Sequence, residues 1–305
     1  MESASHPLAS PSLQTAECRL LKNGNDSSEP SADDPRGATG CPHGCVTKAQ
    51  APCRVAADNP AVNDPQTIAV IDFETTGISP AQGARATEVA AVLVRDGRIV
   101  GRFASLMRSG AWVPPFIEQL TGISNRMLAA APPSAEVMQQ VSAFTAGCGV
   151  VAHNAAFDRS FWQHELAMAG CGSAGDAGHD GHSLHSPPLP LDDSFACTLL
   201  LSRRLFPELP NHRLGTLVQW HGIVPTGRAH RALADAEVTA ELWLRIVAQV
   251  QRRYAATVPF GLLRALQRSP RGGLERCVQR YFAGLPAGLP VPTPAAAAGG
   301  AALPA

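Results

Sequence analysis

The chain has 305 residues, of which 45% are hydrophobic and 16% charged, and its formal net charge is zero at pH 7. This length allows a full hydrophobic core in one or two domains, and the neutral total gives no argument for a nucleic-acid partner. No apolar run approaches the roughly 18 residues of a membrane span, and no secretory signal is evident at the N-terminus. We therefore expect a cytoplasmic protein with no membrane partner, whose cysteines are thiols.

Residues 1–64 are rich in Ser, Pro, Asn, Asp, Gly and Ala and show no sustained hydrophobic period. This composition predicts a disordered N-terminal leader. Metal-ligand residue types occur within it at Cys41, His43, Cys45 and Cys53. Their spacing fits no common zinc pattern and no second ligand pair follows, so a zinc site is the minor alternative.

Residues 65–254 carry the patterns of an ordered domain. Strands are predicted over 67–74 and 149–153, as a hairpin over 86–108 with its turn at Asp96-Gly97, and as the start of 193–206. Helices are predicted over 114–120, 134–147 with a Ser134 cap, 155–170, the rest of 193–206, 213–222 and 232–253. Three antiparallel strands followed by two strands with attached helices predict a mixed, five-stranded α/β sheet.

Two segments outside these elements are read from composition. Residues 172–191 form a predicted Gly/Ser/His/Pro loop, where His179, His182 and His185 favour a mobile insertion over a metal site. Residues 255–305 are predicted as a short basic helical extension, with helices over 262–268 and 274–282, and a Pro/Ala/Gly-rich tail. The arginines between 245 and 280 could track a phosphate backbone or form the solvated face of a helix.

Two carboxylates close the strand in "IAVIDFETTG", residues 68–77. Asp72 and Glu74 project to the same face of the strand, at the end where an α/β sheet usually places ligands. Like charges held close repel each other unless something positive lies between them. Carboxylate oxygens are the ligands that Mg²⁺ and Mn²⁺ prefer, so the pair suggests a divalent cation. Two solvated acids at an exposed strand end are the alternative.

Further candidate residues occur on the elements that flank the same sheet edge. Asp158 follows a buried strand on the first turn of a helix, where an acid can also simply complement the helix dipole. His230 and Asp235 lie five residues apart at the entry to the long helix. Alone, His230 would more often be a surface residue or a cap. Four acids and a histidine around one edge form a much stronger joint signal for a catalytic site.

The segments "VIDFETTG", "HNAAFD" and "HRALADA" resemble the three motifs of the DEDDh branch of the DnaQ-like 3′–5′ exonucleases. That family includes the epsilon subunit of bacterial DNA polymerase III, ribonuclease T and oligoribonuclease. The resemblance extends over about residues 67–250 and includes all five signature positions. The segment "LTGISNRML", residues 120–128, also resembles the Gly-Ile-containing segment between the first two motifs. An RNase H-like fold is implied.

The resemblance also implies a two-metal hydrolysis of phosphodiester bonds at the 3′ end of single-stranded nucleic acid, releasing nucleoside 5′-monophosphates. Two divalent cations, Mg²⁺ or Mn²⁺ and roughly 4 Å apart, would activate the water and stabilise the leaving oxygen. Asp72 would bridge them, Glu74 and Asp235 would hold the nucleophile-side cation, and Asp158 would complete the second site. His230 would take the proton from the attacking water.

Substrate contacts are expected near the first two motifs. The Thr75-Thr76-Gly77 turn could offer backbone N–H groups and hydroxyls to the terminal nucleotide, whereas Phe73 alternates away from the acids and is expected in the core. Asn154 and Phe157 lie where family members often bind substrate. The alternatives are a helix cap for Asn154 and packing for Phe157.

DNA is favoured over RNA as the substrate, with an RNA-trimming exoribonuclease of the same family as the alternative. A non-catalytic nucleic-acid-binding adaptor would have lost at least one signature residue, and none is missing. No convincing clamp-binding peptide follows Arg253, which favours a stand-alone exonuclease or an epsilon-like paralogue. A DNA polymerase assembly is the secondary partner class.

Overall fold

The computed structural model describes residues 67–170, 195–254 and 258–284. The predicted leader with its Cys/His segment, the His-containing loop and the Pro/Ala/Gly-rich tail lie outside these residues. Their predictions, and the predicted domain boundaries, therefore stay predictions. Among the described residues, no helix combines the length and the apolar character that crossing a membrane requires.

A five-stranded mixed sheet forms the centre of the described residues. Its strands are β1 (Thr67–Thr75), β2 (Ala86–Arg95), β3 (Arg98–Leu106), β4 (Gly149–Ala152) and β5 (Phe195–Cys197). The order across the sheet is β3-β2-β1-β4-β5, with β1–β2 and β2–β3 antiparallel and β1–β4 and β4–β5 parallel. The predicted α/β fold class and its division into three antiparallel and two parallel strands are confirmed.

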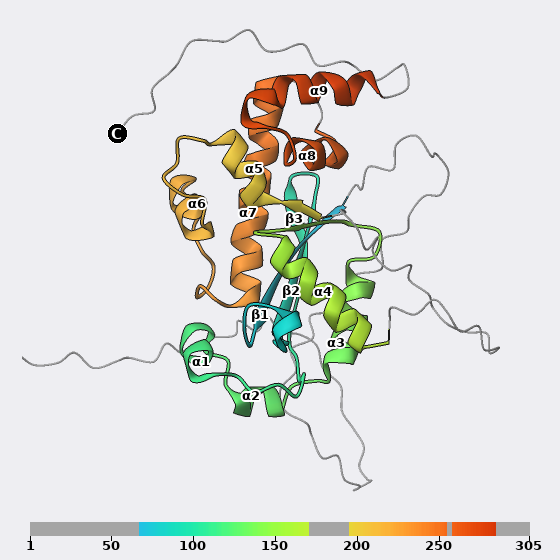
Figure 1. Ribbon diagram of the computed structural model, residues 1–305, viewed down its shortest axis with the longest axis vertical. Helices are drawn as coiled ribbons and strands as arrows, with labels where there is room; N and C mark the ends of the chain where they lie inside the picture. Colours follow the sequence, from blue (N-terminus) through green and yellow to red (C-terminus); the bar gives the residue numbers. More distant parts are fainter. Residues whose placement is uncertain (1–66, 171–194, 255–257, 285–305) are drawn as a thin grey trace, which may run out of the picture. The chain divides into compact units, whose positions relative to one another are not determined.

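Helices cover both faces of the sheet (Figure 1). They are α1 (Pro115–Thr121), α2 (Asn125–Ala129), α3 (Ser134–Phe144), α4 (Ala156–Met168), α5 (Thr198–Leu205), α6 (Leu214–Trp220), α7 (Ala232–Tyr254), α8 (Phe260–Leu266) and α9 (Leu274–Ala283), with 3-10 turns η1 (Pro80–Gln82) and η2 (Arg271–Gly273). One core cluster joins α7 to Ile68 and Val70 of β1, and the other joins α3 and α4 to Ile71 and Phe73. Because β1 is covered on both faces, its residues read as a nearly continuous apolar run.

Local sequence signals explain some of the element boundaries. Asp96 and Gly97 have φ values of 52° and 75°, the left-handed conformations that a two-residue hairpin turn requires. The predicted Ser134 cap is wrong: Ser134 is the first helical residue of α3, Pro133 precedes it, and no side chain caps this helix. The sequence prediction also missed α2, whose cap is Ser124, with Oγ accepting from the Met127 N–H at 3.2 Å.

The C-terminal helices α8 and α9 pack onto the same core as α5 and α7. Leu262, Leu263 and Leu266 of α8 are at most 1% exposed. The side chain of Gln267 extends the edge of the sheet: its Oε1 accepts from the Cys197 N–H at 2.7 Å and its Nε2 donates to the Phe195 carbonyl at 3.1 Å. The arginines of α9 point outward, and Figure 1 shows α9 at the opposite end of the described fold from η1 and α1.

We predict that Gln267→Ala lowers the free energy of unfolding by about 2–4 kcal/mol, because two buried backbone groups of β5 lose their partner. Denaturant unfolding followed by circular dichroism measures this change. Gln279→Ala, at an exposed position of α9, is the matched control and should change stability by less than about 0.5 kcal/mol. Equal effects of the two substitutions would contradict this role of Gln267.

Candidate active site

The end of β1 carries the first two predicted site residues. In the β1–β2 register Asp72 lies opposite Ala90 and Glu74 lies opposite Glu88, and the register shifts directly after Glu74. Asp72 and Glu74 alternate with Phe73, so they belong to the face that α7 covers. Phe73 is 4% exposed and packs edge-to-face against Trp162 on the other face, as the core prediction required.

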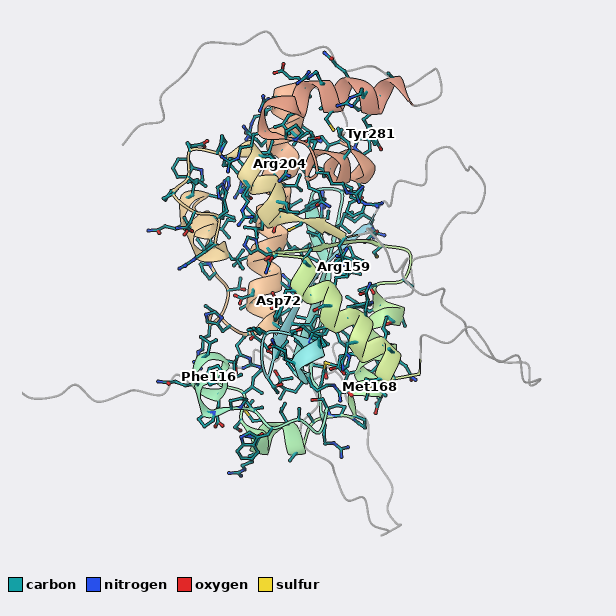
Figure 2. The ribbon with its side chains drawn as sticks, in the orientation of Figure 1. Asp72, Phe116, Arg159, Met168, Arg204 and Tyr281 are labelled. Carbon is teal, nitrogen blue, oxygen red and sulfur yellow. The ribbon has the colours of Figure 1, made fainter. Side chains whose placement is uncertain are left out.

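Asp158 lies near the end of β1 as well, on helix α4, which follows the parallel strand β4. Because β4 runs parallel to β1, both strands end at one edge of the sheet, and α4 starts four residues after β4 ends. Asp158 is 2% exposed, and its Oδ1 accepts a hydrogen bond from the Phe73 N–H at 3.2 Å. Figure 2 shows Asp72 in the region where β1 lies between α4 and α7.

His230 and Asp235 complete the group from the start of α7. Asp235 is on the first turn of this helix, and its Oδ2 accepts from the His230 N–H at 3.1 Å. His230 is exposed and has a φ of 61°, a left-handed conformation that is uncommon for a residue with a side chain. One ligand atom each from Glu74, His230 and Asp235 lie within 4.8 Å of one another.

Crowding of these carboxylates changes their acidity. Burial, followed by the charges of Asp158, Glu74 and Asp235, raises the pKa of Asp72 well above its usual range. Burial and the charge of Asp235 raise the pKa of Glu74 to about 8. Burial raises the pKa of Asp158 to about 7, against the opposing effect of the Phe73 N–H. Carboxylates in such a group become fully ionised at neutral pH when a positive charge joins them.

The donor set of this cluster fits a hard divalent cation. We use "carboxylate cluster" for Asp72, Glu74, Asp158 and Asp235. Their side chains come from three elements and converge at one sheet edge, and burial raises the pKa of all four, with neighbouring negative charges adding to the rise at Asp72, Glu74 and Asp235. Oxygen-rich sites of this kind suit Mg²⁺ or Mn²⁺, and His230 adds one nitrogen within reach.

Two nearby features were missed by the sequence prediction. Glu88 of β2 is 4% exposed and its carboxylate binds Arg231, with Nη2–Oε1 and Nε–Oε2 distances of 2.6 and 3.0 Å. A charged residue within the apolar run "ATEVAAVLV" was the available signal. Ile78, directly after the predicted substrate turn, is 77% exposed, and no sequence signal singled it out.

The predicted substrate residues lie beside the cluster, and their hydroxyls already have partners. The Thr75 hydroxyl donates to the Gly77 carbonyl at 2.6 Å, and the Thr76 Oγ1 accepts from the Arg85 N–H at 3.0 Å. Asn154 is exposed in a left-handed conformation, and its side chain does not cap α4. Phe157 packs against Phe161 at a ring distance of 4.9 Å. A substrate contact by any of them stays a prediction.

Residues 69–243, more than half of the chain, match the RNase_T exonuclease family. The chain belongs to this exonuclease family. It is 34% identical over 203 residues to the 3′–5′ exonuclease DinG of Bacillus subtilis strain 168, covering 67% of this chain and 19% of that protein. It is 31% identical over 188 residues to DNA polymerase III subunit epsilon of Aquifex aeolicus strain VF5, covering 62% of this chain and 84% of that protein.

A solved structure of exonuclease X in complex with 5′ overhanging duplex DNA is 27% identical, with a TM-score of 0.43, covering 59% of this chain and 91% of that one. The predicted membership of the DEDDh-type, DnaQ-like 3′–5′ exonucleases and the predicted enzyme class are confirmed at the level of the family. Members of this family generally use divalent metals. The chain spans only about a fifth of DinG.

We predict that divalent cation binding releases protons and strengthens as pH rises. Glu74 and Asp158, with pKa values of about 8 and about 7, hold protons near neutral pH that a cation must displace. Apparent affinity for Mn²⁺ should therefore increase as pH passes from about 7 to about 8. Isothermal titration calorimetry in buffers of different ionisation enthalpy measures both the affinity and the number of protons released.

Asp72→Asn is the matched control for this titration, because it keeps the shape of the side chain and removes the charge at the centre of the cluster. The variant should bind Mn²⁺ more weakly. It should also raise the Tm of the metal-free protein at pH about 8, where ionised wild-type carboxylates repel one another. An affinity for Mn²⁺ that does not change with pH would contradict the prediction.

Proposed function

We propose that this protein is a metal-dependent 3′–5′ exonuclease that removes nucleoside 5′-monophosphates from single-stranded nucleic acid, with DNA as the preferred substrate. The convergence of Asp72, Glu74, Asp158, His230 and Asp235 at the end of β1 carries the proposal. These residues come from β1, α4 and the start of α7. Asp158 accepts a hydrogen bond from the Phe73 N–H, and Asp235 accepts one from the His230 N–H.

In the proposed mechanism the carboxylate cluster holds two divalent cations, Mg²⁺ or Mn²⁺. Asp72, whose charge interacts with those of the other three acids, would contribute to both cations, Glu74 and Asp235 would hold the cation on the nucleophile side, and Asp158 would hold the other. Cations bound there supply the Lewis acidity that activates water and offsets charge on the leaving oxygen. The carboxylates lie at fixed positions on the backbone, so they need little rearrangement when substrate binds.

His230 is the proposed general base. Its imidazole stands exposed at the edge of the carboxylate cluster, within reach of Glu74 and Asp235, where it can accept a proton from the attacking water. Its backbone N–H is tied to Asp235, so the base and a metal-holding residue keep a fixed relation. The proton then leaves to solvent, because the ring is on an exposed turn.

Exposed apolar side chains beside the site support a single-stranded substrate. Ile78 follows the Thr75–Gly77 turn, and Trp112 and Phe116, which is labelled on α1 in Figure 2, are 72% and 66% exposed. Helix α1 contacts the His230 loop, since Arg228 Nη2 donates to the Leu120 carbonyl at 3.2 Å. Unpaired bases stack on such side chains, whereas paired bases are already stacked within a duplex.

The preference for DNA is supported by the relatives. The match to a DNA polymerase III epsilon subunit covers 84% of that protein, so the likeness extends over most of a DNA polymerase subunit. The same match supports a DNA polymerase assembly as a partner class. Recognition of RNA would require contacts to the 2′-hydroxyl, which makes a direct comparison of the two substrates decisive.

A time course with matched 5′-labelled single-stranded DNA and RNA oligonucleotides tests this function. With Mg²⁺ or Mn²⁺ we expect a ladder that shortens from the 3′ end, faster on DNA, and no products in EDTA. Asp72→Asn should abolish turnover while retaining the fold, because it removes the central metal-holding charge. Faster trimming of RNA would reverse the substrate assignment, and intact binding without cleavage of either substrate would favour the adaptor alternative.

We predict that His230→Ala lowers kcat by roughly 10²–10⁴, the usual contribution of a positioned general base. The KM for the oligonucleotide should change far less, because the proposed role of His230 is in proton transfer. Steady-state kinetics on single-stranded DNA measure both. His221→Ala, which changes a histidine on the C-cap of α6, is the control. An unchanged kcat in His230→Ala would remove His230 from its proposed role.

A further inference from the structure

Glu88 is an additional acid at this sheet edge that the proposed chemistry does not use. It lies directly opposite Glu74 in the β1–β2 register, so the two side chains share a face of the sheet. Its carboxylate accepts three hydrogen bonds: Oε1 accepts from Arg231 Nη2, and Oε2 accepts from Arg231 Nε and from the Ala232 N–H at 3.0 Å. These three donors occupy most of the roughly four acceptor positions of the carboxylate, so Glu88 is held by Arg231 and Ala232.

These contacts fix the point at which the chain enters α7. The Ala232 N–H is one of the unpaired donors at the N-terminus of the helix, and Glu88 caps it from a strand 144 residues earlier in the chain. The preceding residue, Arg231, binds Glu88 through two parallel hydrogen bonds, a geometry that resists rotation. Both anchored residues follow His230 directly.

His230 needs such an anchor because its conformation is unfavourable. A left-handed backbone at a residue with a side chain costs about 1–3 kcal/mol and persists only where the surroundings impose it. Upstream, Arg228 is tied to the Gln119 and Leu120 carbonyls of α1. Downstream, the chain is held by the Glu88–Arg231 pair. The exposed imidazole therefore stands on a short segment anchored at both sides.

We propose that Glu88 and Arg231 are positioning residues, which hold His230 in its left-handed conformation beside the carboxylate cluster. This inference rests on the proposed function of His230 as the general base. Arginine is required at residue 231 because its planar fork matches both carboxylate oxygens, whereas a lysine offers one point charge. The positive charge of Arg231 also separates two acids that face each other directly across β1 and β2.

The first test observes His230 in the metal-free protein. In ¹⁵N-histidine-labelled protein, Arg231→Lys should shift and broaden the ring resonances of His230, which are identified by their loss in His230→Ala. The resonances of the half-buried His153 and the buried His212 should stay in place. An unchanged His230 signal would overturn the proposal. If Arg231→Lys does not fold, Glu88→Gln replaces it, because Arg231 is 38% exposed and water can solvate its freed guanidinium.

The second test asks whether Arg231 acts through His230. We expect Arg231→Lys to lower kcat on single-stranded DNA by about 10–100-fold, as misplacement of a catalytic group by about 1 Å does. The KM for DNA and the affinity for Mn²⁺ should stay nearly constant. In a His230→Ala background, the same substitution should cost less than about twofold, because the group that it positions is already absent.

Arg85→Lys is the matched control for the double-mutant comparison. Arg85 makes an equivalent paired contact, with Nε and Nη2 each 2.8 Å from Glu165, on the opposite face of the sheet. Whatever its effect on kcat, the effect should be the same with and without His230. An Arg231→Lys effect that is equally independent of His230 would overturn the positioning role while leaving the proposed function intact. A fully active His230→Ala would instead remove His230 from its proposed role as general base, and the spectra would still decide whether Glu88 and Arg231 order His230.

Discussion

Mutual repulsion among the four members of the carboxylate cluster is the constraint on which the rest of this structure depends. Their negative charges meet at one sheet edge, and burial strengthens the repulsion because little water separates them. Burial and the charge of Asp235 raise the pKa of Glu74 to about 8, and burial raises the pKa of Asp158 to about 7. A fold that keeps such a cluster must hold its backbone in place by contacts elsewhere.

Two arginine–carboxylate pairs supply those contacts, and they share one pattern. Glu165 of α4 binds Arg85 and also accepts from the Ala86 N–H at 3.0 Å. Glu88 of β2 binds Arg231 and also accepts from the Ala232 N–H. In each case one buried carboxylate accepts two hydrogen bonds from an arginine and a third from the N–H of the residue that follows this arginine. The carboxylate therefore holds both the arginine charge and the adjoining backbone in place.

Strand β2 therefore connects the elements that carry the site, although it provides no member of the carboxylate cluster. Through Glu165 it is tied to α4, which carries Asp158, and through Glu88 to the start of α7, which carries Asp235. Its register places it directly against Glu74 of β1. Removing one partner of such a pair leaves a buried charge without compensation, which destabilises a protein far more than the pair itself stabilises it.

The sequence predicted the convergence of the four acids better than the contacts that hold them in place. The period of two in β1 placed Asp72 and Glu74 on one face, and the parallel arrangement of β1 and β4 brought Asp158 to the same edge. These features follow from local patterns. The partner of Glu88 lies 143 residues away, and the left-handed conformation of His230 arises from that distant contact, so neither has a local signal.

Weak or ambiguous local signals also explain the smaller errors in the predicted helices. Helix α2 has five residues, too few to show a hydrophobic period, so only its Ser124 cap marked it. The Ser134 cap was misplaced by one residue because Pro133 occupies the capping position without a side-chain acceptor. Predicted helices with longer amphipathic patterns, such as α7, were located closely, since tertiary packing and local pattern agree there.

The two kinds of group in this site differ in how they are held. The cluster acids lie on regular elements, and Asp158 is almost fully buried, which suits charges that must keep fixed distances. His230 is exposed on an irregular segment, which suits a group that exchanges a proton with water. Because Arg228 joins that segment to α1, the apolar surface around Phe116 is connected to His230, the proposed general base. A nucleobase stacked on that surface would thus be held in a fixed position relative to His230, which acts on the adjoining phosphodiester.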